Sequence, residues 1–214
     1  PDIAELFNRY QKAESRKWKQ NLFSPLSMKF SLVDPERFLT RTVRWVRPVF
    51  TPMGLAAWSA LTGTALMLAA RHWPALTDNL ADRVLSAENL ILIWLLFPFI
   101  KAVHELAHGY AVKVWGGEVH EMGIMLLVLM PIPFVNASAA LAFRERARRV
   151  VVGAAGILAE TAVASVALFL WIHLEPGNLR AVAYNVVFIA GVTTIFFNAN
   201  PLLRYDGYYI LSDL

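Results

Sequence analysis

The chain contains no cysteine, and this absence sets the first limit on its chemistry. Without thiols there is no disulfide framework and no thiolate metal site, so a zinc ion would need histidine and carboxylate ligands. No basic and aromatic stripe persists outside the N-terminal flank, which argues against nucleic acid as a partner. Internal repeats and low-complexity tracts are also absent, and no cleavable signal peptide precedes the first apolar run near Met53.

Apolar residues dominate the amino-acid composition. Hydrophobic side chains make up 57% of the 214 residues, and the mean hydropathy is +0.47. Soluble domains are usually less apolar, so a membrane protein is expected. Four runs reach the length of about 20 residues that a helix needs to cross a bilayer. These runs cover approximately 53–70, 89–113, 150–172 and 181–203.

The basic residues predict how these spans are oriented. Lys and Arg are frequent in residues 1–50, and the loop at 144–149 is rich in arginine. In the loops at 71–88 and 173–180 the only Lys or Arg residues are Arg71, Arg83 and Arg180. Because basic residues are retained on the cytoplasmic side, the N-terminus and the 144–149 loop are predicted to be cytoplasmic. We therefore expect an all-α polytopic membrane protein with about four transmembrane helices and both ends in the cytoplasm.

Two parts are predicted, divided at residue 50. Residues 1–50 form a cytoplasmic, basic N-terminal segment, and residues 51–214 form the transmembrane core. Arginines at helical spacing in the first part indicate an amphipathic interfacial helix, with a solvated basic helix as the alternative. These arginines are Arg37, Arg41, Arg44 and Arg47. The chain begins at Pro1 and stops at Leu214 within a sequence pattern, so we expect a fragment of a longer protein.

The second apolar run contains a His-Glu-x-x-His motif, formed by His104, Glu105 and His108. Histidines four residues apart share one face of a helix and can hold one metal ion. Glu105 can then take a proton from a water that the ion activates. Such a charged group at the end of an uncharged run is costly in lipid, which favours a functional role over chance occurrence.

Catalytic zinc usually has three protein ligands, and Asp206 is the strongest candidate for the third. The fourth run passes from outside to inside and ends near Asp206, on the membrane face predicted for His104 and His108. An interfacial ion pair with Arg204 is the alternative role for Asp206. His120 is closer in sequence to the motif, but it lies across a glycine turn, and we expect no ligand role for it.

The segment between the second and third runs differs from its neighbours. Gly116 and Gly117 are predicted to end the motif helix. Residues 122–130 are too short to span and too apolar for a soluble loop, which indicates a re-entrant or β-like element near the site. An extended edge within 118–135 could pair with an extended substrate.

Polar residues and helix breakers interrupt the fourth run, and we assign them supporting or substrate-positioning roles. Asn198 either orients substrate or the metal-bound water, or bonds the backbone of a neighbouring helix. Pro201 removes a backbone donor, and Gly207 is expected to allow an unusual turn. Asn200 belongs to the same group. Glu160, about ten residues into the third run, either supports the metal site or is a neutral structural residue.

The motifs together resemble the site-2 protease family of intramembrane zinc metalloproteases. Asn198, Pro201, Asp206 and Gly207 fall at the offsets of the family's Asn-x-x-Pro-x-x-x-x-Asp-Gly motif. Residues 155–160 resemble its Ala-Gly-Pro-x-x-Asn element, with Ile157 in place of the proline and Glu160 in place of the asparagine. Residues 200–209 are similar to a bacterial branch of peptide zinc metalloproteases, whose members can carry export-related domains.

This resemblance covers roughly residues 90–214. It implies an integral protein of the bacterial cytoplasmic (inner) membrane that cleaves a peptide or transmembrane segment, with one Zn²⁺ held by His104, His108 and Asp206. Export partners or further domains are possible partners besides the lipid bilayer. The alternative is a non-proteolytic metal-binding membrane module for peptide export or transport. Glu105 favours the protease, because metal binding alone does not require it.

Overall fold

The structure, a computed structural model, describes residues 27–127 and 130–214. The first 26 residues of the predicted N-terminal segment lie outside this range. Four helices are long and apolar enough to cross a membrane. They are α3 (Pro52–Arg71), α6 (Ala87–Val114), α7 (Arg146–His173), and α8 (Asn178–Val192) with its π-helical continuation η3 (Thr193–Asn198). The predicted all-α polytopic membrane fold is confirmed.

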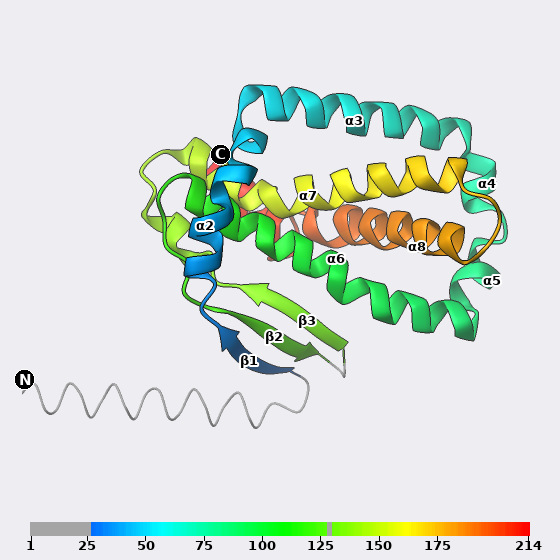
Figure 1. Ribbon diagram of the computed structural model, residues 1–214, viewed down its shortest axis with the longest axis horizontal. Helices are drawn as coiled ribbons and strands as arrows, with labels where there is room; N and C mark the ends of the chain where they lie inside the picture. The colour runs from blue at the N-terminus through cyan, green and yellow to red at the C-terminus, as the bar shows by residue number, and fades with distance from the viewer. Residues whose placement is uncertain (1–26, 128–129) are drawn as a thin grey trace, which may run out of the picture.

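The helix α7 lies at the centre of the bundle. It packs against α3, α6 and α8, and the short helix α9 (Asp206–Asp213) also lies against it. Figure 1 shows the long helices running side by side. Large apolar side chains on their outer faces, such as those of Met67 and Phe99, are exposed, as expected for a surface that contacts lipid.

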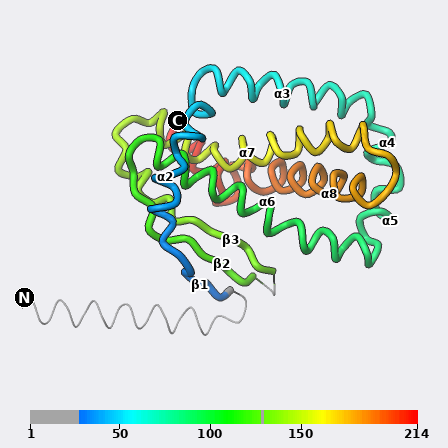
Figure 2. Tube along the Cα trace, in the orientation of Figure 1, coloured from blue at the N-terminus to red at the C-terminus, as the bar shows by residue number. Residues whose placement is uncertain are grey.

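The two ends of the bundle are built differently, as the trace in Figure 2 shows. At one end, here called the α4–α5 end, α4 (Trp73–Thr77) and α5 (Leu80–Leu85) connect α3 to α6. The other, here called the sheet end, carries α2 (Glu36–Val46), η1 (Arg47–Phe50), η2 (Ser138–Ala142), α9 and a small sheet. The α2 helix confirms the helical periodicity predicted for the arginine-rich stretch.

The sheet contains three antiparallel strands with β2 in the middle. They are β1 (Ser27–Val33), β2 (Met122–Leu127) and β3 (Met130–Val135). The apolar segment after α6 is therefore β-structured, as one of the two alternatives predicted. The β1 strand was not predicted, and it joins the N-terminal segment to the core, with Phe30 opposite Ile124.

The fourth span ends earlier than predicted. Its apolar run extends to residue 203, whereas η3 ends at Asn198. There the N–H of Ala199 bonds to the carbonyl of Thr194, five residues back, which widens the last turn. Asn200 Oδ1 then accepts a hydrogen bond of 2.9 Å from Leu202 N, and this local turn replaces further helix.

Candidate metal centre

His104 and His108 lie one turn apart on α6, and both are buried. Asp206, the first residue of α9, lies beside them. The two Nε2 atoms are 3.0 Å apart, and Asp206 Oδ2 is 3.0 Å from that of His104 and 3.4 Å from that of His108. Tetrahedral zinc, with bonds of about 2.0–2.1 Å, separates its ligand atoms by about 3.3 Å. The three side chains thus form a group that could hold a metal ion.

The contacts of the two Nδ1 atoms determine whether each Nε2 atom carries a proton or a free lone pair. His108 Nδ1 lies 2.7 Å from the carbonyl oxygen of Val152, so this nitrogen carries the ring proton. His104 Nδ1 lies 3.1 Å from Glu160 Oε1, and this carboxylate favours the ring proton on Nδ1, although the N–H is not aligned for a hydrogen bond. Both Nε2 lone pairs then face each other and the carboxylate of Asp206. Among the described residues Asp206 Oδ2 has no hydrogen-bond partner, and a cation between these donors would remove their repulsion.

The chemistry of the donors restricts the kind of ion. Two imidazole nitrogens and one carboxylate oxygen suit zinc and related divalent transition metals better than calcium or magnesium. Asp206 supplies a carboxylate oxygen as the third donor, and its negative charge strengthens the site for a cation.

Gly156 on α7 makes room for the ring of His104. A Cβ atom at this position would lie 2.4 Å from both Cε1 and Nε2 of His104, which is well inside van der Waals contact. Gly156 belongs to the stretch 155–160 that resembles a family element, but no role was predicted for it, because its importance depends on where the ring of His104 lies. The close approach lets α7 support a metal ligand that belongs to α6.

Glu160 lies behind His104 and is fully buried. Its Oε1 faces His104 Nδ1 and accepts a hydrogen bond of 2.6 Å from Lys101 Nζ. Its Oε2 accepts hydrogen bonds from three side chains of η3, namely Thr193 (3.1 Å), Thr194 (2.8 Å) and Asn198 (2.9 Å). Glu160 thereby connects α6, α7 and η3 around one metal ligand, and it is paired with a cation rather than isolated.

Lys101 was not identified from the sequence, although a signal was present. It is a charged residue on an apolar helix, one turn before His104 and therefore on the same face. Only 9% of its surface is exposed, so its charge depends on Glu160 for compensation.

The other predicted residues are distributed around the centre. Asn198 donates a hydrogen bond to Glu160 on α7, so it contacts a side chain that supports His104 rather than the backbone of a neighbouring helix. Gly207 does not adopt the unusual turn that we expected, because it lies in the first turn of the helix α9. Instead, a Cβ atom at Gly207 would lie 2.6 Å from the carbonyl oxygen of Ala199, so glycine allows α9 to approach the end of η3.

Asn200, Pro201 and His120 lie outside the ligand group. Asn200 and Pro201 belong to the turn between η3 and α9, where the Asn200 side chain bonds to the backbone on both sides. His120 is on the surface and contacts the carboxylates of Asp34 and Glu118. Asn200 and Pro201 therefore help to form the turn that leads to Asp206, and they are not metal ligands.

Glu105 is partly buried and connects the motif helix to the sheet. Its Oε2 accepts a hydrogen bond of 3.0 Å from the N–H of Val135, the last residue of β3. The candidate base is therefore held where an extended strand reaches the metal centre.

Comparisons with protein-family models, with curated proteins and with solved structures find no match to this chain. What the centre does must therefore be inferred from its own residues.

Proposed function

We propose that this chain is the catalytic core of an intramembrane zinc metalloprotease of the site-2 protease family, in a bacterial cytoplasmic membrane with its N-terminus in the cytoplasm. One observation carries the proposal: two imidazole lone pairs and one carboxylate converge within 3.4 Å on the helix that also presents Glu105. A site that only stored metal would not need a carboxylate immediately after its first ligand.

The residues divide the chemistry among them. Bound zinc supplies Lewis acidity, which lowers the pKa of water towards about 7 and polarises a peptide carbonyl. Glu105 takes the proton of the attacking water and delivers it to the leaving amine. The Val152 carbonyl accepts the Nδ1 proton of His108, and the Glu160 carboxylate lies 3.1 Å from His104 Nδ1, so both residues favour Nε2 lone pairs that would face the ion.

The β3 strand offers an extended edge next to Glu105. The N–H of Asn136 donates a hydrogen bond to the carbonyl of Glu121, just before β2, and so faces into the sheet. The N–H of Val135 faces away from the sheet and donates to Glu105. Since successive residues of a strand face opposite sides, the backbones of Pro131 and Pro133 also face outward. Proline has no N–H, so in this strand the outer edge presents carbonyl acceptors at both prolines and an N–H donor only at Val135.

A peptide substrate would fit this edge once it is extended. Its N–H groups would bond to the carbonyls of Pro131 and Pro133, as in β-strand addition. Its own carbonyl could take the N–H of Val135, which would release Glu105 for proton transfer close to the peptide bond. A helical transmembrane substrate hides its peptide bonds and must therefore unwind locally before it binds.

The substitution Glu105→Gln tests the proposal, because it removes the base while keeping size and hydrogen-bonding capacity. The full chain, purified in detergent with zinc, would be incubated with β-casein and with membrane-inserted single-span peptides, and products would be identified by mass spectrometry. We expect cleavage by the unchanged protein, its loss on chelation, and no cleavage by Glu105→Gln despite unchanged zinc content. His120→Ala is the matched control and should cleave normally.

Two results would contradict the proposal. Equal cleavage by Glu105→Gln and by the unchanged protein would remove Glu105 from the mechanism. Zinc binding without cleavage of any peptide by the unchanged protein would favour the metal-binding transport module instead.

A further inference from the structure

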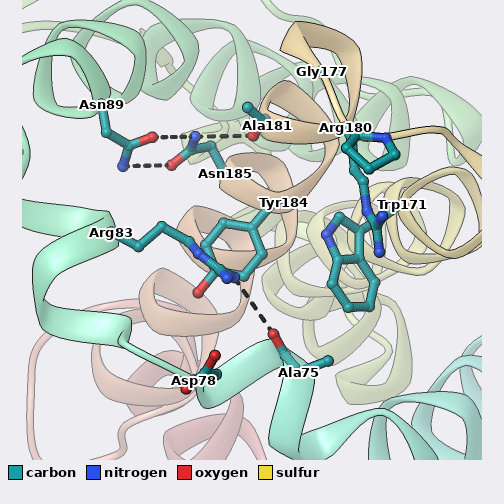
Figure 3. Close-up of a pocket in the computed structure, with 11 residues that line it drawn as sticks. Ala75, Asp78, Arg83, Asn89, Trp171, Gly177, Arg180, Ala181, Tyr184 and Asn185 are labelled. Atoms are coloured by element: carbon teal, nitrogen blue, oxygen red, sulfur yellow. Dashed lines mark hydrogen bonds between the residues drawn. The ribbon is translucent and has the colours of Figure 1, made fainter.

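A second polar site lies at the α4–α5 end of the bundle, at the opposite end from the metal centre. It is a pocket of about 460 Å³ that is lined by residues from α4 to α8 (Figure 3). The buried rings of Trp171 on α7 and Tyr184 on α8 form one wall. Asn89 and Asn185 exchange hydrogen bonds of 3.1 and 2.6 Å at its edge, which fixes α6 against α8. The volume falls within the range of small-ligand pockets.

Two arginines enter this pocket from different helices. The guanidinium carbon of Arg83 lies 4.6 Å from the ring centroid of Tyr184, and that of Arg180 lies 5.0 Å from the ring centroid of Trp171. The two rings are 6.4 Å apart, and the Tyr184 hydroxyl is fixed by a hydrogen bond of 2.9 Å to Leu76 O. Figure 3 shows both guanidinium groups against these rings. Each cation is therefore positioned by a cation–π contact with one of two neighbouring rings.

Neither arginine has an acidic partner. Among residues 27–127 and 130–214, the ion pairs involve other basic side chains and leave Arg83 and Arg180 unpaired. Asp78 also lines the pocket but forms no ion pair with them. Two guanidiniums and one carboxylate give the lining a net charge of +1.

The sequence adds an independent reason to regard these arginines as selected for this position. The connections 71–88 and 173–180 hold three basic residues, and two of them, Arg83 and Arg180, line this pocket. Connections on the non-cytoplasmic side of a membrane protein are depleted in such residues. Their convergence from separate connections therefore indicates a shared ligand.

We propose that this pocket binds a phosphodiester group, supplied by the headgroup of an anionic phospholipid in the adjoining leaflet. Guanidinium groups recognise phosphate oxygens with charge-assisted hydrogen bonds, and the single negative charge of a phosphodiester balances the lining. The pocket opens at the end of the spanning helices, where headgroups lie. This inference does not depend on the proposed protease activity.

The test measures binding of short-chain phosphatidylglycerol to the full chain in nonionic detergent, from the rise of its unfolding temperature with lipid concentration. We expect a saturable rise, because a ligand that binds only the folded state stabilises it. In the double variant Arg83→Gln and Arg180→Gln the affinity should fall about tenfold or more. Arg71→Gln, at the same end of the bundle but outside the pocket lining, is the matched control and should bind normally.

A variant that should increase the affinity distinguishes a specific effect on binding from a loss of binding caused by misfolding. Asp78 is exposed and forms no ion pair within the described residues, so Asp78→Asn should fold normally and bind phosphatidylglycerol severalfold more tightly. Zinc content, measured in parallel, should be the same in all variants and reports on the metal centre separately. Equal phosphatidylglycerol affinity in the unchanged protein, the double variant and Asp78→Asn would overturn the proposal.

Binding of inorganic phosphate and of glycerol phosphate, measured in the same way, shows whether the bound phosphate group must come from a lipid. If phosphatidylglycerol binds and these soluble compounds do not at the same concentrations, the headgroup is the ligand. If they bind equally well and depend on Arg83 and Arg180, the phosphate site stands but a lipid source is wrong.

Discussion

The metal centre and the α4–α5 pocket, at opposite ends of the helix bundle, carry opposite charge balances. With carboxylates ionised, the metal centre holds one ammonium and three carboxylates, a net charge of −2 from Lys101, Glu105, Glu160 and Asp206. The α4–α5 pocket has a net charge of +1. A divalent cation would balance the metal centre, and a phosphodiester would balance the pocket. In an apolar bundle, uncompensated charge therefore favours the kind of ligand proposed for each site.

The ends also differ in how tightly their charges are enclosed. At the sheet end, Lys101 and Glu160 are buried and 2.6 Å apart. At the α4–α5 end, Arg83 and Arg180 lie 4.6 and 5.0 Å from ring centroids and remain accessible to solvent or lipid. Substitutions at the sheet end should therefore affect the folded state much more.

The largest expected effect comes from Lys101→Met. This change leaves the carboxylate of Glu160 buried without its cation and should lower the free energy of unfolding by about 3–5 kcal/mol. Arg180→Met, at the other end, should lower it by less than about 1 kcal/mol, because it removes only a cation–π contact. Denaturant unfolding in detergent measures both values.

The double variant Lys101→Met with Glu160→Gln is the control for this prediction. It removes both charges and should recover much of the lost stability. Similar losses for Lys101→Met and Arg180→Met would mean that the two ends do not differ in the way described.

A smaller effect is expected for Gly156→Ala, which acts on the metal centre without changing any charge. The added methyl group would lie 2.4 Å from the ring of His104 and must displace it. Zinc affinity, measured by competition with a chromophoric chelator, should fall about 10- to 100-fold. Gly63→Ala on α3 is the matched control, since its Cβ would meet nothing within 4 Å. Unchanged affinity in Gly156→Ala would show that the close approach has no role.

The smallest effect concerns Glu36, which bonds to Lys113 and to the N–H of Val119 and so joins α2 to the end of α6. Burial acts to raise the pKa of Glu36, but these hydrogen bonds outweigh it and lower that pKa below its ordinary 4.5. The ionised side chain therefore stabilises the fold above about pH 4.5, and this contribution is lost as the pH falls through the folded-state pKa.

Glu36→Gln should accordingly reduce stability by about 0.5–1 kcal/mol at neutral pH. The difference from the unchanged protein should shrink as the pH falls below about 4.5 and through the folded-state pKa of Glu36. Unfolding measured across this pH range checks the prediction, and a difference that does not depend on pH would contradict it.

Hydropathy was sufficient to predict the four spans, because length and apolar character are properties of a single segment. The grouping of Asp206 with His104 and His108 was also accessible, since the order of the spans places the end of the fourth run near the motif. The early end of η3 was not, because the apolar run continues past Asn198 and the local turn at Asn200 decides where the helix stops.

Other features depend on contacts between distant segments. The sequence of β1 alternates apolar and polar residues, yet nothing in it identifies β2 as its partner. The role of Gly156 follows only from the position of the His104 ring, and that of Gly207 from the approach to Ala199. Lys101 was detectable as an intramembrane charge, whereas its pairing with Glu160 required the packing of α6 against α7.

The central claim is that His104, His108 and Asp206 together bind one zinc ion. Elemental analysis of the purified full chain tests it most directly, with Asp206→Ala as the test variant and His120→Ala as the control. We expect about one zinc ion per chain in the unchanged protein and in His120→Ala, and little zinc in Asp206→Ala. Full retention of zinc by Asp206→Ala, or no zinc in the unchanged protein, would contradict the claim.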